Sequence, residues 1–158
     1  MLRISHNNTL IYWLSVGVAM ALTIIPLPFA SLNLMPDWVL LVLIYWSLGR
    51  PEDFNIDKAW CVGILIDVLS GQLLGQHALA YVMSLFLVLK QHKMIRQFSI
   101  IQQSLVLGLI LFVAQVVLFW IVHINHDISL SAFLWPVLTG ILCWPLVFIT
   151  LNKVRTLL

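Results

Sequence analysis

Asp67 is a carboxylate deep in an apolar stretch of the chain, nine residues after Lys58. An ionisable side chain in such surroundings is costly to bury, so it marks a candidate functional residue. It could transfer a proton, bind a ligand or partner, or hydrogen-bond locally and pin the turn that follows its helix. The local groups that could donate hydrogen bonds to it are the Ser70 hydroxyl, the Gly71 amide, Gln72 and His77.

Small residues share a predicted helical face with Asp67. Helical spacing places Gly63 one turn before it and Ser70 or Gly71 one turn after it. Small side chains let a second helix approach closely within a membrane, which favours direct contact with a partner. The candidate partner-binding residues are Asp67, Gly63, Ser70, Gly71, Gly75 and Asp37. Asp37 has a simpler alternative, because it begins an apolar run after Pro36 and an acidic group interacts well with a helix N-terminus.

Enzymatic chemistry has little support in the chain. Acid–base catalysis needs two groups placed against one substrate, and only Gln115 and Thr139 are candidates by type for a second group facing Asp67. The sequence has no glycine-rich phosphate loop, nucleophile elbow or zinc-protease motif. We therefore expect neither an enzyme nor a cofactor.

Metal binding is also not expected. His123, His126 and Asp127 form a small cluster after the fifth apolar run. Two histidines and one carboxylate at a helix end fall short of the ligand set of a structural zinc site. Cys61 and Cys143 both lie inside apolar runs, where we interpret them as small buried hydrophobic residues.

The composition predicts an integral membrane protein. Of 158 residues, 62% are hydrophobic and only 9% are charged, whereas soluble domains carry about 25% charged residues. A soluble fold would have too few polar side chains to cover its surface. The formal net charge of +2 is too small to indicate nucleic-acid binding.

The basic residues predict the topology. Six apolar runs cover approximately residues 10–29, 37–48, 59–74, 78–89, 100–122 and 132–151, and all eight Lys and Arg residues lie in alternate gaps between them or at the ends. Cytoplasmic loops retain basic residues. The sequence therefore predicts an all-α protein, one domain over residues 1–158, with six transmembrane helices and both termini in the cytoplasm. We expect the first run to be an uncleaved span.

Two features of the spans leave alternatives open. The second, third and fourth runs fall short of the roughly 20 residues that cross a bilayer. The third and fourth could cross with local thinning of the bilayer or form a re-entrant hairpin, and the charge pattern fits both. The predicted cytoplasmic basic loop contains Lys90, Lys93 and Arg96, which would contact anionic lipids or a cytoplasmic partner. Pro145 should kink the last span.

Several motifs resemble the rod shape-determining protein MreD family. The most specific is the run from Gly63 to Leu79, GILIDVLSGQLLGQHAL. The segment PDWVLLVLIYW, residues 36–46, is also similar, as are Trp144-Pro145 and the ending Lys153-Val-Arg155. The resemblance extends over nearly the whole chain.

The resemblance implies a non-enzymatic subunit of the cell-elongation machinery in the bacterial inner membrane. Such a subunit works with the bitopic protein MreC, on a complex of a penicillin-binding transpeptidase and a polytopic glycosyltransferase, and indirectly with actin-like filaments. It would regulate peptidoglycan synthesis and cell shape. A distant likeness to the membrane substrate-binding subunits of energy-coupling-factor transporters implies their six-helix fold. It also leaves an alternative function, a small-molecule-binding membrane subunit of a transporter.

Overall fold

The computed structural model describes residues 6–25, 35–54, 56–123 and 130–157, and the regular structure within these ranges is entirely α-helical. The helices are α1 (His6–Ile24), α2 (Trp38–Gly49), α3 (Ile56–Ser70), α4 (Gln76–Ile95), α5 (Ile100–His123) and α6 (Leu130–Leu157). Each predicted apolar run therefore corresponds to one helix. The all-α prediction is confirmed for the described residues.

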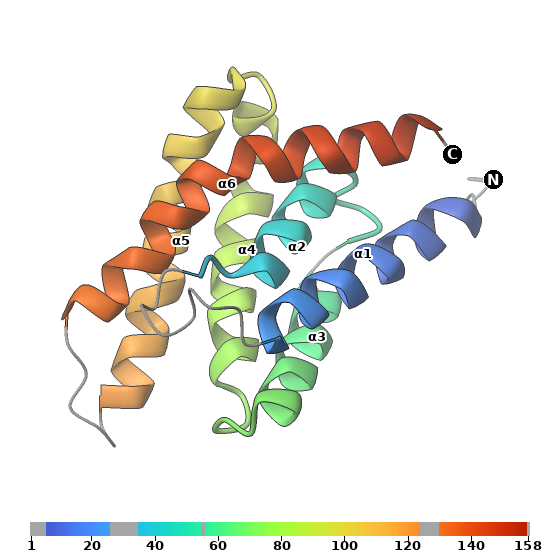
Figure 1. The fold of residues 1–158 in the computed structure, drawn as a ribbon. Helices are drawn as coiled ribbons and strands as arrows, with labels where there is room; N and C mark the ends of the chain where they lie inside the picture. The colour runs from blue at the N-terminus through green and yellow to red at the C-terminus, as the bar shows by residue number, and fades with distance from the viewer. Residues whose placement is uncertain (1–5, 26–34, 55, 124–129, 158) are drawn as a thin grey trace.

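Helix α2 lies at the centre of the bundle, where it packs against α1, α4 and α6 (Figure 1). Every residue from Val39 to Leu48 is buried, because neighbouring helices cover this helix on several sides. At about 1.5 Å per residue its twelve residues span about 18 Å. The second apolar run therefore forms the core of the protein, where little of its surface is left to face lipid.

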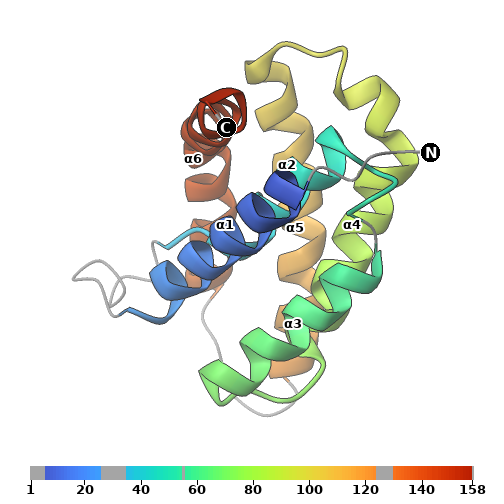
Figure 2. The same ribbon diagram turned by 90° about the vertical axis from the view of Figure 1, so that its right-hand side faces the viewer.

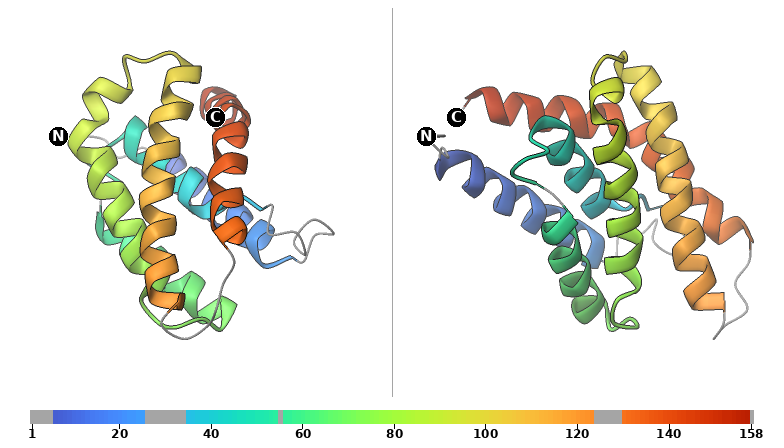
Figure 3. Two further views of the ribbon diagram at one scale, coloured as in Figure 1. Left: turned by 90° about the vertical axis from the view of Figure 1, so that its left-hand side faces the viewer. Right: turned by 180° about the vertical axis from the view of Figure 1, so that it is seen from behind.

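Helices α4, α5 and α6 lie side by side in sequence order (Figure 3). Among the described residues, only these three helices contain segments long and apolar enough to cross a membrane: Gln76–Ile95, Ile100–Ile121 and Leu134–Arg155. Helices α1 and α2 are apolar but shorter. The structure thus supports a membrane protein with at least three candidate spans, and the count of six crossings stays a prediction.

The expectation that the fourth span is short, followed by a basic loop, is wrong. Helix α4 has 20 residues and continues through Lys90 and Lys93 to Ile95, and Arg96 caps its C-terminus. Cations are favourable in the last turn of a helix because they face the negative end of its dipole. The first Lys therefore marks where apolar sequence ends and not where the helix ends. A helix of this length fits a full crossing better than a re-entrant hairpin.

Helices α3 and α4 form an antiparallel hairpin that packs closely (Figure 2). The turn between them, residues 71–75, contains Gly71 at φ 63° and Gly75 at φ 97°. Both lie in the left-handed region, which glycine adopts without steric cost. The turn lies at the N-terminal end of α4, and Arg96 lies at the other end, about 30 Å away along a 20-residue helix.

Helix α6 changes direction part-way along its length (Figure 1), and Pro136 and Pro145 both lie inside it. Proline removes a backbone hydrogen bond and clashes with the preceding turn, which bends a helix. After the bend, the C-terminal half of α6 packs across α2, where the Phe148 ring lies 5.8 Å from that of Tyr45. The bend therefore carries Asn152 and Arg155 toward the C-terminal end of α2.

Candidate functional site

The Asp67 side chain is fully buried and connects α3 to the start of α4. Its Oδ2 accepts a hydrogen bond from the Gly75 amide at 2.8 Å, and its Oδ1 accepts one from the His77 amide at 3.1 Å. The first amides of a helix lack partners within the helix, and Gly75 has no side chain to cap them. Asp67 satisfies them from the preceding helix, which is the local role that the sequence left open.

His77 is the second partner of Asp67. Its Nδ1 lies 2.7 Å from Asp67 Oδ1, and since both Asp67 oxygens already accept backbone amides, we assign Nδ1 as the donor in this contact. The His77 side chain is 20% exposed, so the imidazole reaches from the buried carboxylate to the surface. Its ring packs edge-on against Tyr81, one helical turn further along α4, with 5.8 Å between centroids.

Tyr81 extends this polar contact to α2. Its hydroxyl donates to Asp37 Oδ1 at 2.9 Å, and the same oxygen accepts the Leu40 amide at 3.0 Å. Asp37 is the N-cap of α2, as its place at the start of the apolar run predicted. We call Asp67, His77, Tyr81 and Asp37 the polar cluster. It connects α2, α3 and α4 near one end of the bundle.

Gly63 is where α3 and α4 come closest. A β-carbon built on Gly63 would lie 2.3 Å from the Ala78 Cα and 2.6 Å from the Ala78 nitrogen. Both distances are far below van der Waals contact, so a larger residue would push the helices apart. The small face that the sequence predicted for a close approach is covered here by α4 of the same chain.

The other candidate residues of this region lie on the outside of the hairpin. Ser70 and Gly71 are exposed. A cavity of about 410 Å³ borders the turn, lined by Trp60, Leu73, Leu74, Gly75, Gln76, Leu79, Val82 and Ile121. Gln76 is 4% exposed, and its Oε1 is buried without a hydrogen-bond partner. We call this the hairpin cavity. It is lined mostly by apolar residues together with Gln76, and Asp67 is not among the described residues that line it.

The basic candidates lie at the opposite end of α4. Lys90, Lys93 and Arg96 are all exposed. They therefore belong to a different surface from the polar cluster, and the structure does not bring the two groups together.

Among the residues that the structure describes, the remaining candidates form no further site. Within the described ranges, no group of three His, Cys, Asp or Glu side chains could hold a metal ion. His126 and Asp127 lie outside the described residues, as does the side chain of His123. Thr139 donates to the carbonyl of Trp135 in its own helix at 2.9 Å. Cys61 is a free, exposed cysteine, contrary to the expectation of burial, because the outer face of α3 has no covering helix in the single chain.

Sequence reasoning found Asp67 but identified only some of its partners. His77 was among the expected donors, whereas the Gly75 amide was not. Tyr81 was missed, although its spacing of four residues from His77 places both on one helical face. Asp37 and Tyr81 are 44 positions apart, and no local sequence signal connects them.

These features define an all-helical membrane protein in which a buried polar cluster fastens three helices together. The model of the family described as rod shape-determining protein MreD matches residues 5–154. The rod shape-determining protein MreD of Haemophilus influenzae is 31% identical over 142 residues, covering 87% of this chain and 86% of that protein. The chain therefore belongs to the MreD family of rod shape-determining proteins. No solved structure matches it significantly.

Proposed function

We propose that this protein is a non-enzymatic subunit of the cell-elongation complex in the bacterial inner membrane. It binds MreC and, through MreC, helps to regulate a penicillin-binding transpeptidase and its polytopic glycosyltransferase, with actin-like filaments as indirect partners. Family membership supports the role in rod shape. The three candidate spans support the membrane location.

The proposed orientation has six crossings with both termini in the cytoplasm. Lys90, Lys93 and Arg96 lie at one end of α4, and Arg155 lies in the last turn of α6. The α4–α5 connection and the end of α6 lie on the same side of the molecule, opposite the α3–α4 turn (Figure 1). Cytoplasmic ends retain basic residues, so in the proposed orientation the polar cluster and the hairpin cavity lie toward the outer face of the membrane.

The observation that carries the partner proposal is the hairpin cavity. Leu73 is 54% exposed, Leu74 72% and Leu79 49%, around the buried and unpaired Oε1 of Gln76. A transmembrane helix with a small polar donor, such as a Ser or Thr hydroxyl, would cover this apolar surface and pair that oxygen. We assign this place to the single transmembrane helix of MreC.

In this proposal the polar cluster positions the docking surface. Asp67 and Gly63 set the distance between α3 and α4, and Asp37 attaches α4 to α2 through Tyr81. Ser70, Gly71 and Gly75 lie in or next to the turn, where a helix passing over the cavity would contact them. Asp67 thus acts on the partner through the shape of the turn.

Co-purification of tagged MreC with two matched variants tests the proposed docking surface. Leu79→Trp fills the hairpin cavity and should abolish capture of MreC. Leu14→Trp places the same side chain in a separate apolar groove between α1 and α6, which is also lined by Val18, Val42 and Leu151, and should leave capture intact. Both positions are exposed, at 49% and 64%, so neither change should unfold the protein.

The reverse pattern, with capture lost only in Leu14→Trp, would move the partner to the groove between α1 and α6. Capture by both variants would contradict a role for either surface. It would favour the alternative function, a small-molecule-binding membrane subunit of a transporter, for which the hairpin cavity and Gln76 would form the pocket.

A further inference from the structure

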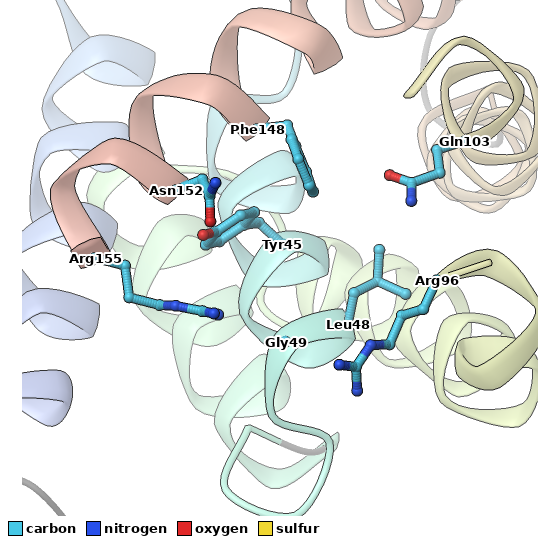
Figure 4. A pocket seen from close by; sticks show the side chains of 8 residues that line it. All are labelled: Tyr45, Leu48, Gly49, Arg96, Gln103, Phe148, Asn152 and Arg155. Atoms are coloured by element: carbon cyan, nitrogen blue, oxygen red, sulfur yellow. The ribbon is translucent and has the colours of Figure 1, made fainter. Parts of the chain in front are cut away.

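A second cavity, of about 160 Å³, lies at the basic end of the bundle (Figure 4). It is formed by the C-terminal ends of α2, α4 and α6 and the N-terminal end of α5. Its lining includes Tyr45, Gly49, Arg96, Gln103 and Arg155. One water needs only about 10–15 Å³ by a comparable measure, so the space admits a larger polar group.

Two of the residues that line the cavity carry a buried polar atom that the described part of the protein leaves unsatisfied. Tyr45 is 4% exposed and Gln103 is 6% exposed. The Tyr45 hydroxyl and the Gln103 Oε1 are buried without a hydrogen-bond partner among the described residues. An unpaired buried polar group costs roughly 1–3 kcal/mol. Two such groups, both in residues that border one cavity, therefore point to a ligand that pairs them.

The donors and acceptors of the cavity define the chemistry of that ligand. Arg96 and Arg155 supply two guanidinium groups, and the described residues that line the cavity include no carboxylate. Gln103 directs its Nε2 to the carbonyls of Ile95 and Phe98, at 3.1 and 3.2 Å, which leaves Oε1 as a fixed acceptor. The ligand must carry anionic oxygens for the arginines and the Tyr45 hydroxyl, and a hydroxyl or similar donor for Gln103.

The position of the cavity indicates where such a ligand comes from. Arg96 follows the candidate span Gln76–Ile95, Gln103 lies in the first turn of Ile100–Ile121, and Arg155 ends Leu134–Arg155. Three spans thus end at the level of the cavity, where lipid head groups lie. Arginine forms paired hydrogen bonds with phosphate oxygens, and basic pockets between spans bind lipid head groups.

We propose that this cavity binds a phosphate ester, supplied by the head group of an anionic glycerophospholipid. Arg96 and Arg155 hold the phosphate oxygens, Tyr45 donates to one of them, and Gln103 accepts from a head-group hydroxyl. Gly49 provides the space for this arrangement, because a β-carbon there would lie 3.2 Å from Arg155 Nη1. The site is independent of MreC and of the hairpin cavity.

The test uses the full-length protein in neutral detergent, with thermal unfolding followed while three compounds are added separately. These are short-chain phosphatidylglycerol, phosphatidylcholine with the same tails, and glycerol 3-phosphate. Phosphatidylglycerol should raise the unfolding temperature saturably and phosphatidylcholine should not. If glycerol 3-phosphate acts as well as phosphatidylglycerol, the phosphate site stands but its source is a soluble ester. If none of the three shifts the transition, the proposal is overturned.

Matched variants distinguish lipid binding in the cavity from a general attraction of the lipid to basic side chains. Arg96→Gln combined with Arg155→Gln should weaken the apparent affinity for phosphatidylglycerol by at least tenfold, since each charged hydrogen bond contributes roughly a factor of ten. Lys90→Gln combined with Lys93→Gln removes the same charge outside the cavity and should leave the affinity within about twofold. Equal losses in both double variants would overturn the proposal.

A second pair of variants tests the contribution of the Tyr45 hydroxyl alone. Tyr45→Phe should weaken binding several-fold and Tyr12→Phe should not, although Tyr12 also has a buried, unpaired hydroxyl, located away from this cavity. Unchanged binding by Tyr45→Phe would remove Tyr45 from the site and contradict the assignment.

Discussion

At the α3–α4 turn, the buried carboxylate of Asp67 accepts hydrogen bonds from two amides and one imidazole, whereas at the other end of the bundle the Tyr45 hydroxyl and the Gln103 Oε1 accept or donate none. Both ends bury polar side chains among apolar helices. The difference is whether the chain itself supplies the partners. A buried group with all its partners holds the fold together, and one without them, in a residue that lines a polar cavity, points to a molecule from outside.

The hairpin illustrates both cases within one region. Asp67 has its partners in α4, while Gln76, next to His77 in the sequence, lines the hairpin cavity and has a buried oxygen without a partner among the described residues. The polar cluster therefore forms the rigid part of the hairpin. The adjoining cavity is the part that remains available to a partner.

Of the variants that test this difference between the two ends, Asp67→Ala should lose the most stability. It leaves two amides and the His77 imidazole without their acceptor, and each unpaired buried donor costs roughly 1–3 kcal/mol. We expect the free energy of unfolding in detergent to fall by about 3 kcal/mol or more. Asp53→Ala is the control, since its contact with Arg50 is an exposed pair at 3.6 Å worth less than about 1 kcal/mol. Similar losses in both variants would show that burial and pairing do not distinguish Asp67.

A second, smaller effect should follow from Gly63→Ala. The added methyl group would overlap the Ala78 backbone, and overpacking of this kind costs about 1–3 kcal/mol. Gly17→Ala in α1 is the matched control, because nothing lies within 4 Å of its built β-carbon and alanine is favoured over glycine in a helix by about 0.5–1 kcal/mol. The unfolding temperature should therefore fall in Gly63→Ala and rise in Gly17→Ala. A shift in the same direction in both variants would argue against close packing of the hairpin.

The smallest effect, and the most direct test of the comparison, comes from two identical changes. Tyr81→Phe removes a hydrogen bond to the Asp37 side chain and should cost about 0.5–1.5 kcal/mol. Tyr45→Phe removes a hydroxyl that has no partner, so in detergent free of anionic lipid it should be neutral or slightly stabilising. Equal destabilisation by the two changes, measured by thermal unfolding, would contradict the distinction between the two ends.

Much of the architecture could be predicted because the signals are local. The apolar runs correspond to the six helices, and Pro36-Asp37 marked the N-cap of α2. Helix ends were less accurate, since α4 continues past Lys90 to Ile95. A charge changes the solvent that a residue prefers, and it does not break the hydrogen bonds of a helix.

By itself the sequence determined the helical class, the membrane setting, the family motif and the singular position of Asp67, because these depend on composition and on neighbours within one helical turn. Only the tertiary structure decided which groups satisfy Asp67, which helix covers Gly63, and which residues form the two cavities. Tyr45 and Arg155 meet because α6 bends across the end of α2. Such contacts arise from the packing of whole helices. No local sequence pattern predicts them, because the residues involved lie far apart in the chain.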